Sequence, residues 1–203
     1  MPSLVTYPFK GLKAKIGVTF LTLNEKPECL IISPGGCGTV SLIKYLNKFI
    51  KSNNYFEKKY SNVGIGHLYK PNKFLIKNNI KVILIYRDFE GIYKSIHSRG
   101  FVRNTLSIFG DLFPFMYINI FKNEKKLKKK YFRYLRNFYS NWENYNKKNI
   151  LRVKFNDLYK KKDIKFKIKN FLDIKNKNFL KNFPKYKRYI KGKNFKDPSS
   201  QLD

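Results

Sequence analysis

Residues 30–46 read LIISPGGCGTVSLIKYL, and this stretch decides the fold. An apolar run breaks at Ser33-Pro34 into a glycine-rich turn, and an amphipathic pattern typical of a helix follows. A strand, a tight turn and a helix in this order place the unpaired N–H groups of the helix N-terminus beside the turn. The stretch therefore predicts a site for an anion such as a phosphate or a sulfate ester.

The glycines of the turn allow positive φ angles and a close approach of the backbone to a ligand. The hydroxyl-bearing residues at the start of the helix add hydrogen-bond donors. The expected anion-binding residues are Gly35, Gly36, Cys37, Gly38, Thr39, Val40 and Ser41. The Walker pattern fails, because no lysine follows a glycine in the turn, which disfavours an ordinary nucleoside triphosphatase. A tight strand-to-helix connection without a ligand explains the same glycines equally well.

The composition fits one α/β domain over residues 1–203. Hydrophobic residues make up 42% of the chain and aromatic residues 17%, which is enough for a core. The 44 basic and 13 acidic residues give a net charge of +31, which attracts phosphate, nucleic acid, acidic glycans or anionic lipid. Much of the excess is lysine among Asn, Ile, Phe and Tyr, a mixture expected from an A/T-rich coding sequence. The charge therefore does not choose a partner.

Other classes of protein are disfavoured by what the sequence contains. Cys29 and Cys37 are too few for a disulfide framework and belong to no metal-ligand cluster, so we expect no metal. Cys37 is a candidate reactive thiol at a helix N-terminus. No segment has the ~18 apolar residues of a membrane span, and the N-terminal residues lack the pattern of a signal peptide. These features predict a cytoplasmic protein with a flexible tail at residues 193–203.

Strand and helix patterns alternate along the chain. We expect strands at 29–33, 81–86 and 150–155, and helices at 39–51, 89–98, 124–148 and 163–172. Continuous apolar strands separated by helices predict a central parallel sheet with helices on both faces. Ligands of such sheets bind beyond the carboxyl ends of the strands. The glycine turn lies at one of these ends, and Arg87 lies at another.

Arg87 and Ser95 form a second pattern suited to phosphate. Ser95 lies eight residues after Arg87, about two helical turns into the expected helix. A guanidinium fork and a hydroxyl suit one phosphate if the helix packs back over the strand end. An Arg–Asp surface pair and a locally bonded helix serine are the alternative interpretations. A ligand with two separated anionic groups explains both patterns together.

These residues resemble the sulfotransferases that use 3′-phosphoadenosine 5′-phosphosulfate, in consistent order over most of residues 30–195. In that family a strand–loop–helix similar to Pro34 to Ser41 holds the 5′-phosphosulfate, and an Arg and a Ser spaced as Arg87 and Ser95 hold the 3′-phosphate. The family's histidine segment resembles Gly66-His67-Leu68 followed by Pro71. The resemblance therefore implies a P-loop-like sulfotransferase fold and His67 as the base.

Two later segments extend the resemblance. ILRVKFNDL resembles the family's strand that ends in Tyr-Glu-Asp-Leu, which implies that Phe155 lies against the adenine. Residues Lys191, Gly192 and Lys193 are similar to the late Arg-Lys-Gly segment that closes on the 3′-phosphate. His97, beside Ser95, would flank the same phosphate.

The chain also departs from the family's pattern. The family's first loop offers a Lys or Arg to the bridging oxygen, and this chain has no cation there, so Lys44 in the following helix is the candidate substitute. Ile65 and Ile190 stand where the family has basic residues, and the chain is short for the family. These departures weigh more against the expected sulfuryl transfer than against the expected binding of the nucleotide.

The resemblance implies sulfuryl transfer from 3′-phosphoadenosine 5′-phosphosulfate, the nucleotide partner, to a hydroxyl or an amine of a carbohydrate or small-molecule acceptor. Metal is not required and adenosine 3′,5′-bisphosphate leaves. If His67 is not the base, Glu90 and Asp111 are the next carboxylates to test. A basic module that binds nucleic acid or another polyanion without catalysis is the alternative, although we do not expect nucleic acid as a partner. A small-substrate kinase is a third interpretation, weakened by the missing Gly-Lys.

Overall fold

The computed structural model describes residues 26–53, 65–102, 105–106, 109, 123–145 and 147–184. In this part of the chain β1 (Cys29–Ile32), β2 (Lys81–Tyr86) and β3 (Ile150–Lys154) form a parallel sheet in the order β1-β2-β3. Cys29 pairs with Lys81, and Val82 pairs with Ile150. The prediction of an α/β chain with a parallel sheet is confirmed.

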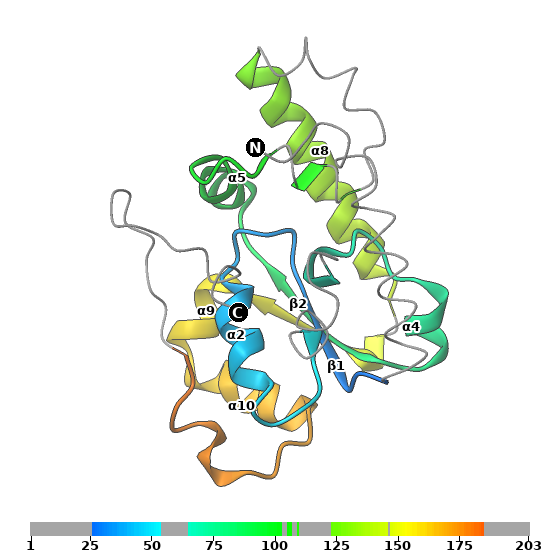
Figure 1. The fold of residues 1–203 in the computed structure, drawn as a ribbon, viewed down its shortest axis with the longest axis vertical. Coiled ribbons are helices and arrows are strands. Elements are labelled where there is room, and N and C mark those ends of the chain that lie inside the picture. The colour runs from blue at the N-terminus through cyan, green and yellow to red at the C-terminus, as the bar shows by residue number, and fades with distance from the viewer. Residues whose placement is uncertain are drawn as a thin grey trace, which may run out of the picture.

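Helices connect and cover the strands. Their bounds are α2 Thr39–Leu46, α4 Lys73–Lys77, α5 Phe89–His97, α8 Glu124–Glu143, α9 Phe155–Lys160 and α10 Lys162–Phe171, with short 3₁₀ segments η2 Ile65–His67, η4 Lys147–Asn149 and η5 Lys177–Phe179. Figure 1 shows α2, α9 and α10 on one side of the sheet and α4 and α8 on the other. β1 is buried along its whole length, because both faces of the sheet are covered.

A side chain forms hydrogen bonds to the backbone at the outer edge of β1. The Asn53 amide accepts a hydrogen bond of 2.7 Å from the Ile31 N–H and donates one of 2.7 Å to the Ile31 carbonyl. One residue beyond the strand, the Ser33 N–H donates to the Gly66 carbonyl at 2.9 Å. These bonds satisfy the polar groups of an edge strand and fix η2 beside the end of β1.

α8 holds the segment after η2 against the other side of the sheet. Trp142 is fully buried, and its indole N–H donates to the Leu68 carbonyl at 3.0 Å. The Tyr145 hydroxyl donates to the Ile80 carbonyl at 2.7 Å, just before β2 begins. Both aromatic residues therefore tie the end of α8 to the segments that lead into and out of α4.

The expected ends of α2 and α8 were wrong by five residues, and the other expected bounds that differ were wrong by one residue. α2 ends at Leu46, because the side chain of Asn47 turns to accept a hydrogen bond from the Ser52 N–H at 3.2 Å. α8 ends at Glu143, where the chain bends so that the Tyr145 ring enters the core. β3 ends at Lys154, because Phe155 begins α9, a helix that the sequence patterns did not predict.

Candidate functional site

The carboxyl ends of the three strands lie at one edge of the sheet, because the strands are parallel. β1 leads into the glycine turn, which we define as residues 33–38, β2 leads into Arg87, and β3 leads into Phe155. Arg87 contacts both of the other segments: its Nη1 donates to the Gly36 carbonyl at 2.9 Å, and its Cζ lies 4.7 Å from the centre of the Phe155 ring. The sheet therefore brings the two phosphate-suited patterns into direct contact.

The glycine turn has the backbone geometry that its sequence predicts. Gly35, Gly36 and Gly38 have φ angles of 92°, 66° and 62°, in the left-handed region that favours glycine. Within the turn, the Ser33 hydroxyl accepts a hydrogen bond from the Gly35 N–H at 3.2 Å, and the Cys37 thiol donates to the Gly35 carbonyl at 3.2 Å. The turn is therefore held in shape by its own side chains.

α2 begins directly after the turn. Gly38 is its N-cap residue and brings no side chain to cap the helix, and the first turn of α2 contains no acidic residue. Thr39 is buried with its hydroxyl 3.5 Å from that of Ser33, whereas Val40 and Ser41 are exposed. The positive end of the α2 dipole therefore has no carboxylate of its own in the helix, which favours an external anion.

Cys37 is fully buried, and burial raises the pKa of its thiol to about 12. Such a thiol stays protonated at neutral pH and is a poor nucleophile. The geometry therefore does not favour the reactive thiol considered from the sequence. Its contribution to an anion site would come from the backbone N–H.

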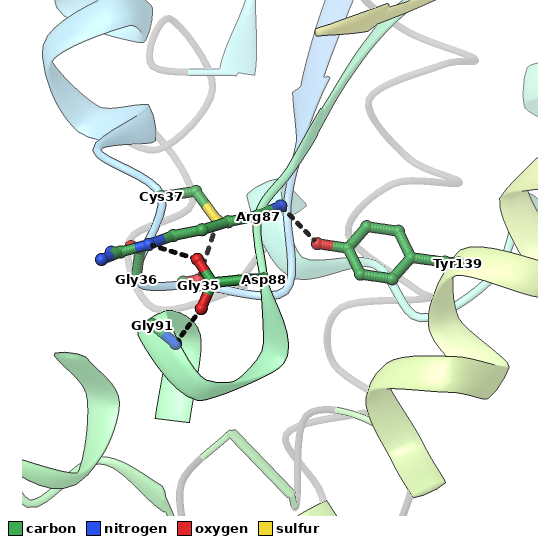
Figure 2. A network of polar contacts seen from close by, with 7 residues as sticks. All are labelled: Gly35, Gly36, Cys37, Arg87, Asp88, Gly91 and Tyr139. Atoms are coloured by element: carbon green, nitrogen blue, oxygen red, sulfur yellow. Dashed lines mark hydrogen bonds and ion pairs between the residues drawn. The ribbon is translucent and has the colours of Figure 1, made fainter. Parts of the chain in front are cut away.

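Figure 2 shows how Arg87 lies between the turn and the start of α5. Its backbone N–H donates to the Tyr139 hydroxyl at 3.3 Å, and its Nε lies 3.8 Å from Asp88 Oδ2. The other oxygen of Asp88 caps α5 by accepting from the Gly91 N–H at 2.6 Å. The Nε atom is buried and has no hydrogen-bond partner among the described residues. The guanidinium is thus fixed at Nη1, and its Nε–H is left without a hydrogen bond among the described residues.

α5 packs directly against the turn, as the spacing of Arg87 and Ser95 predicts. A Cβ placed on Gly36 would lie 3.2 Å from both the Ile92 carbonyl oxygen and Ser95 Cβ, so only glycine allows this approach. Arg99, one turn further, donates from Nε to the Ser95 carbonyl at 2.8 Å and lies with Nη2 3.4 Å from the Ser95 hydroxyl. Ser95 therefore lies against the glycine turn, and the guanidinium of Arg99 bonds to Ser95.

His67 lies against the first residues of the same turn, Ser33 to Gly35. Its Nδ1 is 2.8 Å from the Ser33 carbonyl oxygen, and its Cε1 lies 3.7 Å from where a Cβ on Gly35 would stand. Because a carbonyl only accepts, we assign the proton to Nδ1, which leaves the Nε2 lone pair available. Burial lowers the pKa of His67, and the charge of Arg99 lowers it further against the opposing effect of the Ser33 bond. The imidazole is therefore neutral at pH 7, as a base requires.

Phe155 and Tyr159 lie four residues apart on α9, the helix that follows β3. Both residues contact the glycine turn. Phe155 is 5% exposed, and its ring lies 3.2 Å from where a Cβ on Gly38 would stand. The Tyr159 hydroxyl donates to the Gly38 carbonyl at 2.8 Å. Phe155 thus packs between the turn and the guanidinium of Arg87, and contact with an adenine remains a prediction.

Other expected site residues lie elsewhere or outside the described chain. Lys44 is in the last turn of α2, about 7.5 Å along the helix axis from Thr39, which places it away from the glycine turn. His97 lies with Nε2 3.5 Å from Glu124 Oε1, and Glu90 Oε1 lies 2.7 Å from Lys128 Nζ, so both face α8. Positions Lys191, Gly192, Lys193, the tail 193–203 and Asp111 fall outside the described residues.

Sequence reasoning missed three residues of this site. Arg99 stands four residues after Ser95, and Tyr159 stands four residues after Phe155. The i, i+4 spacing of helices puts such pairs on one face and would have found both. The third is Gly91, which stands four residues after Arg87 and lies beside its guanidinium.

The described residues hold no group of three or more His, Cys, Asp or Glu that could bind a metal ion. Among the helices of these residues, none combines the length and the apolar character that crossing a bilayer needs. Comparison of the chain with protein-family models, with curated proteins and with solved structures found no match.

Proposed function

We propose that this chain binds a nucleotide with two separate anionic groups at the strand ends and transfers a sulfuryl group from 3′-phosphoadenosine 5′-phosphosulfate to a hydroxyl or an amine of a carbohydrate or small-molecule acceptor. The observation that supports this most is the bond from Arg87 Nη1 to the Gly36 carbonyl. It joins the guanidinium after β2 to the anion-suited turn after β1, so that one elongated ligand can contact both.

The two ends of the nucleotide would bind to different elements. The N–H groups of the glycine turn and of the first turn of α2 suit the 5′-phosphosulfate. The remaining N–H groups of Arg87 and the hydroxyl of Ser95 suit the 3′-phosphate. In this arrangement the parallel sheet and its turn form a P-loop-like sulfotransferase architecture.

His67 would act as the general base. The acceptor oxygen forms a bond to sulfur while the bond from sulfur to the 5′-phosphate oxygen breaks, and the acceptor proton moves to His67 Nε2. The neutral tautomer described above has its lone pair on that atom, because Nδ1 is engaged by the Ser33 carbonyl. Adenosine 3′,5′-bisphosphate leaves with the bonding electrons, stabilised by the N–H groups of the turn.

Arg99 is a better candidate than Lys44 for the cation that the loop lacks. Its guanidinium bonds to Ser95, which touches Gly36, and its charge acts on both Cys37 and His67. Lys44 lies at the far end of α2. A guanidinium near the turn would stabilise negative charge on the transferring group and on the departing phosphate.

Binding of a polyanion without catalysis is the second candidate. The exposed residues Lys125, Lys126 and Lys129 on α8 and the net charge of +31 favour it. This proposal explains the charge directly, but it assigns no role to the contacts among Arg87, Ser95, His67 and the turn.

Three measurements separate these proposals. Adenosine 3′,5′-bisphosphate should raise the melting temperature more than ATP does, and labelled sulfate should pass from 3′-phosphoadenosine 5′-phosphosulfate to an acceptor in a screened panel. Strong retention on heparin together with no nucleotide-dependent shift would favour the polyanion module. A larger shift with ATP would instead favour a kinase.

A further inference from the structure

Gly91, the third residue of α5, lies directly beside the guanidinium of Arg87. A Cβ placed on Gly91 would stand 2.6 Å from Arg87 Nε and 2.9 Å from Arg87 Nη2. It would also stand 2.7 Å from Asp88 Oδ2. These distances are shorter than van der Waals contact allows, so any residue with a side chain at this position displaces its neighbours. Figure 2 shows Gly91 at the start of α5, bonded to Asp88.

The backbone does not account for a glycine at this position. Gly91 is inside a helix, and it is absent from the glycines with positive φ in the described residues. Glycine is the least favourable residue of a helix apart from proline, and alanine is the most favourable. The remaining physical reason for glycine is the space that the side chains of Arg87 and Asp88 occupy, and Arg87 supplies two of the three close atoms.

We propose that Gly91 is a positioning residue, whose missing side chain lets the Arg87 guanidinium lie across the first turn of α5 and reach the glycine turn. The proposal rests on the proposed function, because it takes Arg87 as the group that binds the anion. Gly91 touches no ligand in this account and acts only through Arg87.

The surroundings of Arg87 explain why one methyl group would matter. The guanidinium lies between Gly91 and the ring of Phe155, and it bonds to Gly36 at its Nη1 end. The end of an arginine side chain moves more easily than a helix backbone, so a methyl on Gly91 would push the guanidinium away from Gly36. The fold would survive this change, but the guanidinium of Arg87 would no longer be placed to bind an anion at the turn.

The main test compares affinity with stability. Gly91→Ala should weaken adenosine 3′,5′-bisphosphate about 10- to 100-fold, the range of a lost charged hydrogen bond. Its melting temperature should stay equal or rise by about 2 °C, because alanine favours the helix. In an Arg87→Ala background, the same change should alter affinity less than about twofold. Unchanged affinity in the Gly91→Ala protein would overturn the proposal.

Asp88 provides the matched control, because its carboxylate also lies close to Gly91. Asp88→Ser keeps an oxygen that caps α5 and removes the second carboxylate oxygen. The Gly91→Ala loss of affinity should persist in this background if it acts through Arg87. Its disappearance in the Asp88→Ser protein would assign the effect to Asp88 and overturn the proposal.

A measurement without ligand keeps this proposal separate from the proposed function. The buried Nε–H of Arg87 should give a slowly exchanging NMR signal in the wild type, assigned by its loss in Arg87→Lys. Gly91→Ala should abolish that protection. If the wild type does not bind the nucleotide while Gly91→Ala still abolishes protection, the proposed function fails and the positioning role stands. Protection that survives in Gly91→Ala overturns the positioning role. Should Gly91→Ala fail to fold, recovery of folding on adding Arg87→Ala would support the proposal, and no recovery would contradict it.

Discussion

Arg87 Nη1 donates a hydrogen bond of 2.9 Å to the carbonyl oxygen of Gly36, which links the residue that follows β2 to the turn that follows β1. A backbone carbonyl in an anion-suited turn is an unfavourable neighbour for a phosphate, because both carry negative charge on oxygen. By donating a hydrogen bond, the guanidinium offsets the partial negative charge of this carbonyl oxygen. The N–H groups of the turn then make the larger contribution to the local electrostatic field. The bond would therefore favour an anion at the turn even without direct contact between Arg87 and the ligand.

Arg87→Ala should reduce the binding free energy of adenosine 3′,5′-bisphosphate by about 1.5 to 3 kcal/mol, the scale of a hydrogen bond to a charged group. Adenosine 5′-phosphosulfate lacks the 3′-phosphate, so its affinity should fall less. Isothermal titration calorimetry with both ligands measures the difference. Arg87→Lys is the control, since it keeps the charge and removes the fork. Equal losses for the two ligands would remove Arg87 from the 3′-phosphate site.

His67→Ala should lower turnover by about 10²- to 10⁴-fold and leave nucleotide affinity nearly unchanged, as expected of a general base. Because burial lowers the pKa of His67 below 6.5, the wild-type rate should rise with pH through a value below 6.5 and then stay level. The His67→Ala protein should lack this rise. A mutant that retains most of its turnover, or a wild-type rate limb at or above pH 7, would point to a different base.

Arg99→Ala should lower turnover more than Lys44→Ala does, because only Arg99 bonds to a residue that touches the turn. A loss of about tenfold or more is expected for a charge that stabilises the transferring group. Initial rates at saturating nucleotide make the comparison, and the melting temperatures of both variants serve as controls. The reverse order of effects would restore Lys44 as the cation.

The two cysteines should be inert in the folded protein, because Cys29 and Cys37 are both fully buried and burial raises the pKa of each thiol. At pH 8 a thiol reagent such as Ellman's reagent should react with neither until denaturant is added, after which it should titrate both. Rapid reaction of Cys37 in the native protein would mean that the glycine turn is more open than described, and rapid reaction of Cys29 would mean the same for β1.

β1 and β2 could be predicted from the sequence because each contains a short, continuously apolar run that is buried, as in Val82 to Ile85. β3 was predicted from a mostly apolar run, although Val153 is its only buried residue. Parallel pairing then brings the glycine turn and Arg87 to one edge, so the centre of the candidate site was also predictable. The ends of the helices were less predictable. α2 ends at Leu46, because the side chain of Asn47 accepts a hydrogen bond from a residue beyond the helix.

The remaining part of the site depends on how helices pack, which local patterns do not determine. Gly91 is important only because α5 leaves β2 at an angle that lays Arg87 over its first turn. Tyr159 reaches Gly38 only because Phe155 starts a helix where the sequence pattern continued a strand. The contact of Tyr159 with Gly38 joins segments far apart in the chain, and that of Gly91 with Arg87 depends on the angle between β2 and α5, so local sequence patterns specify neither contact.

We propose that the glycine turn and the Arg87–Ser95 pair bind one nucleotide with two anionic groups. Calorimetric titration of the wild-type protein with adenosine 3′,5′-bisphosphate, with 5′-AMP and with 3′-AMP tests it most directly. One site should bind the bisphosphate at least about tenfold more tightly than either monophosphate, since each phosphate adds charged hydrogen bonds. Equal affinity for all three ligands, or no binding of the bisphosphate, would contradict it.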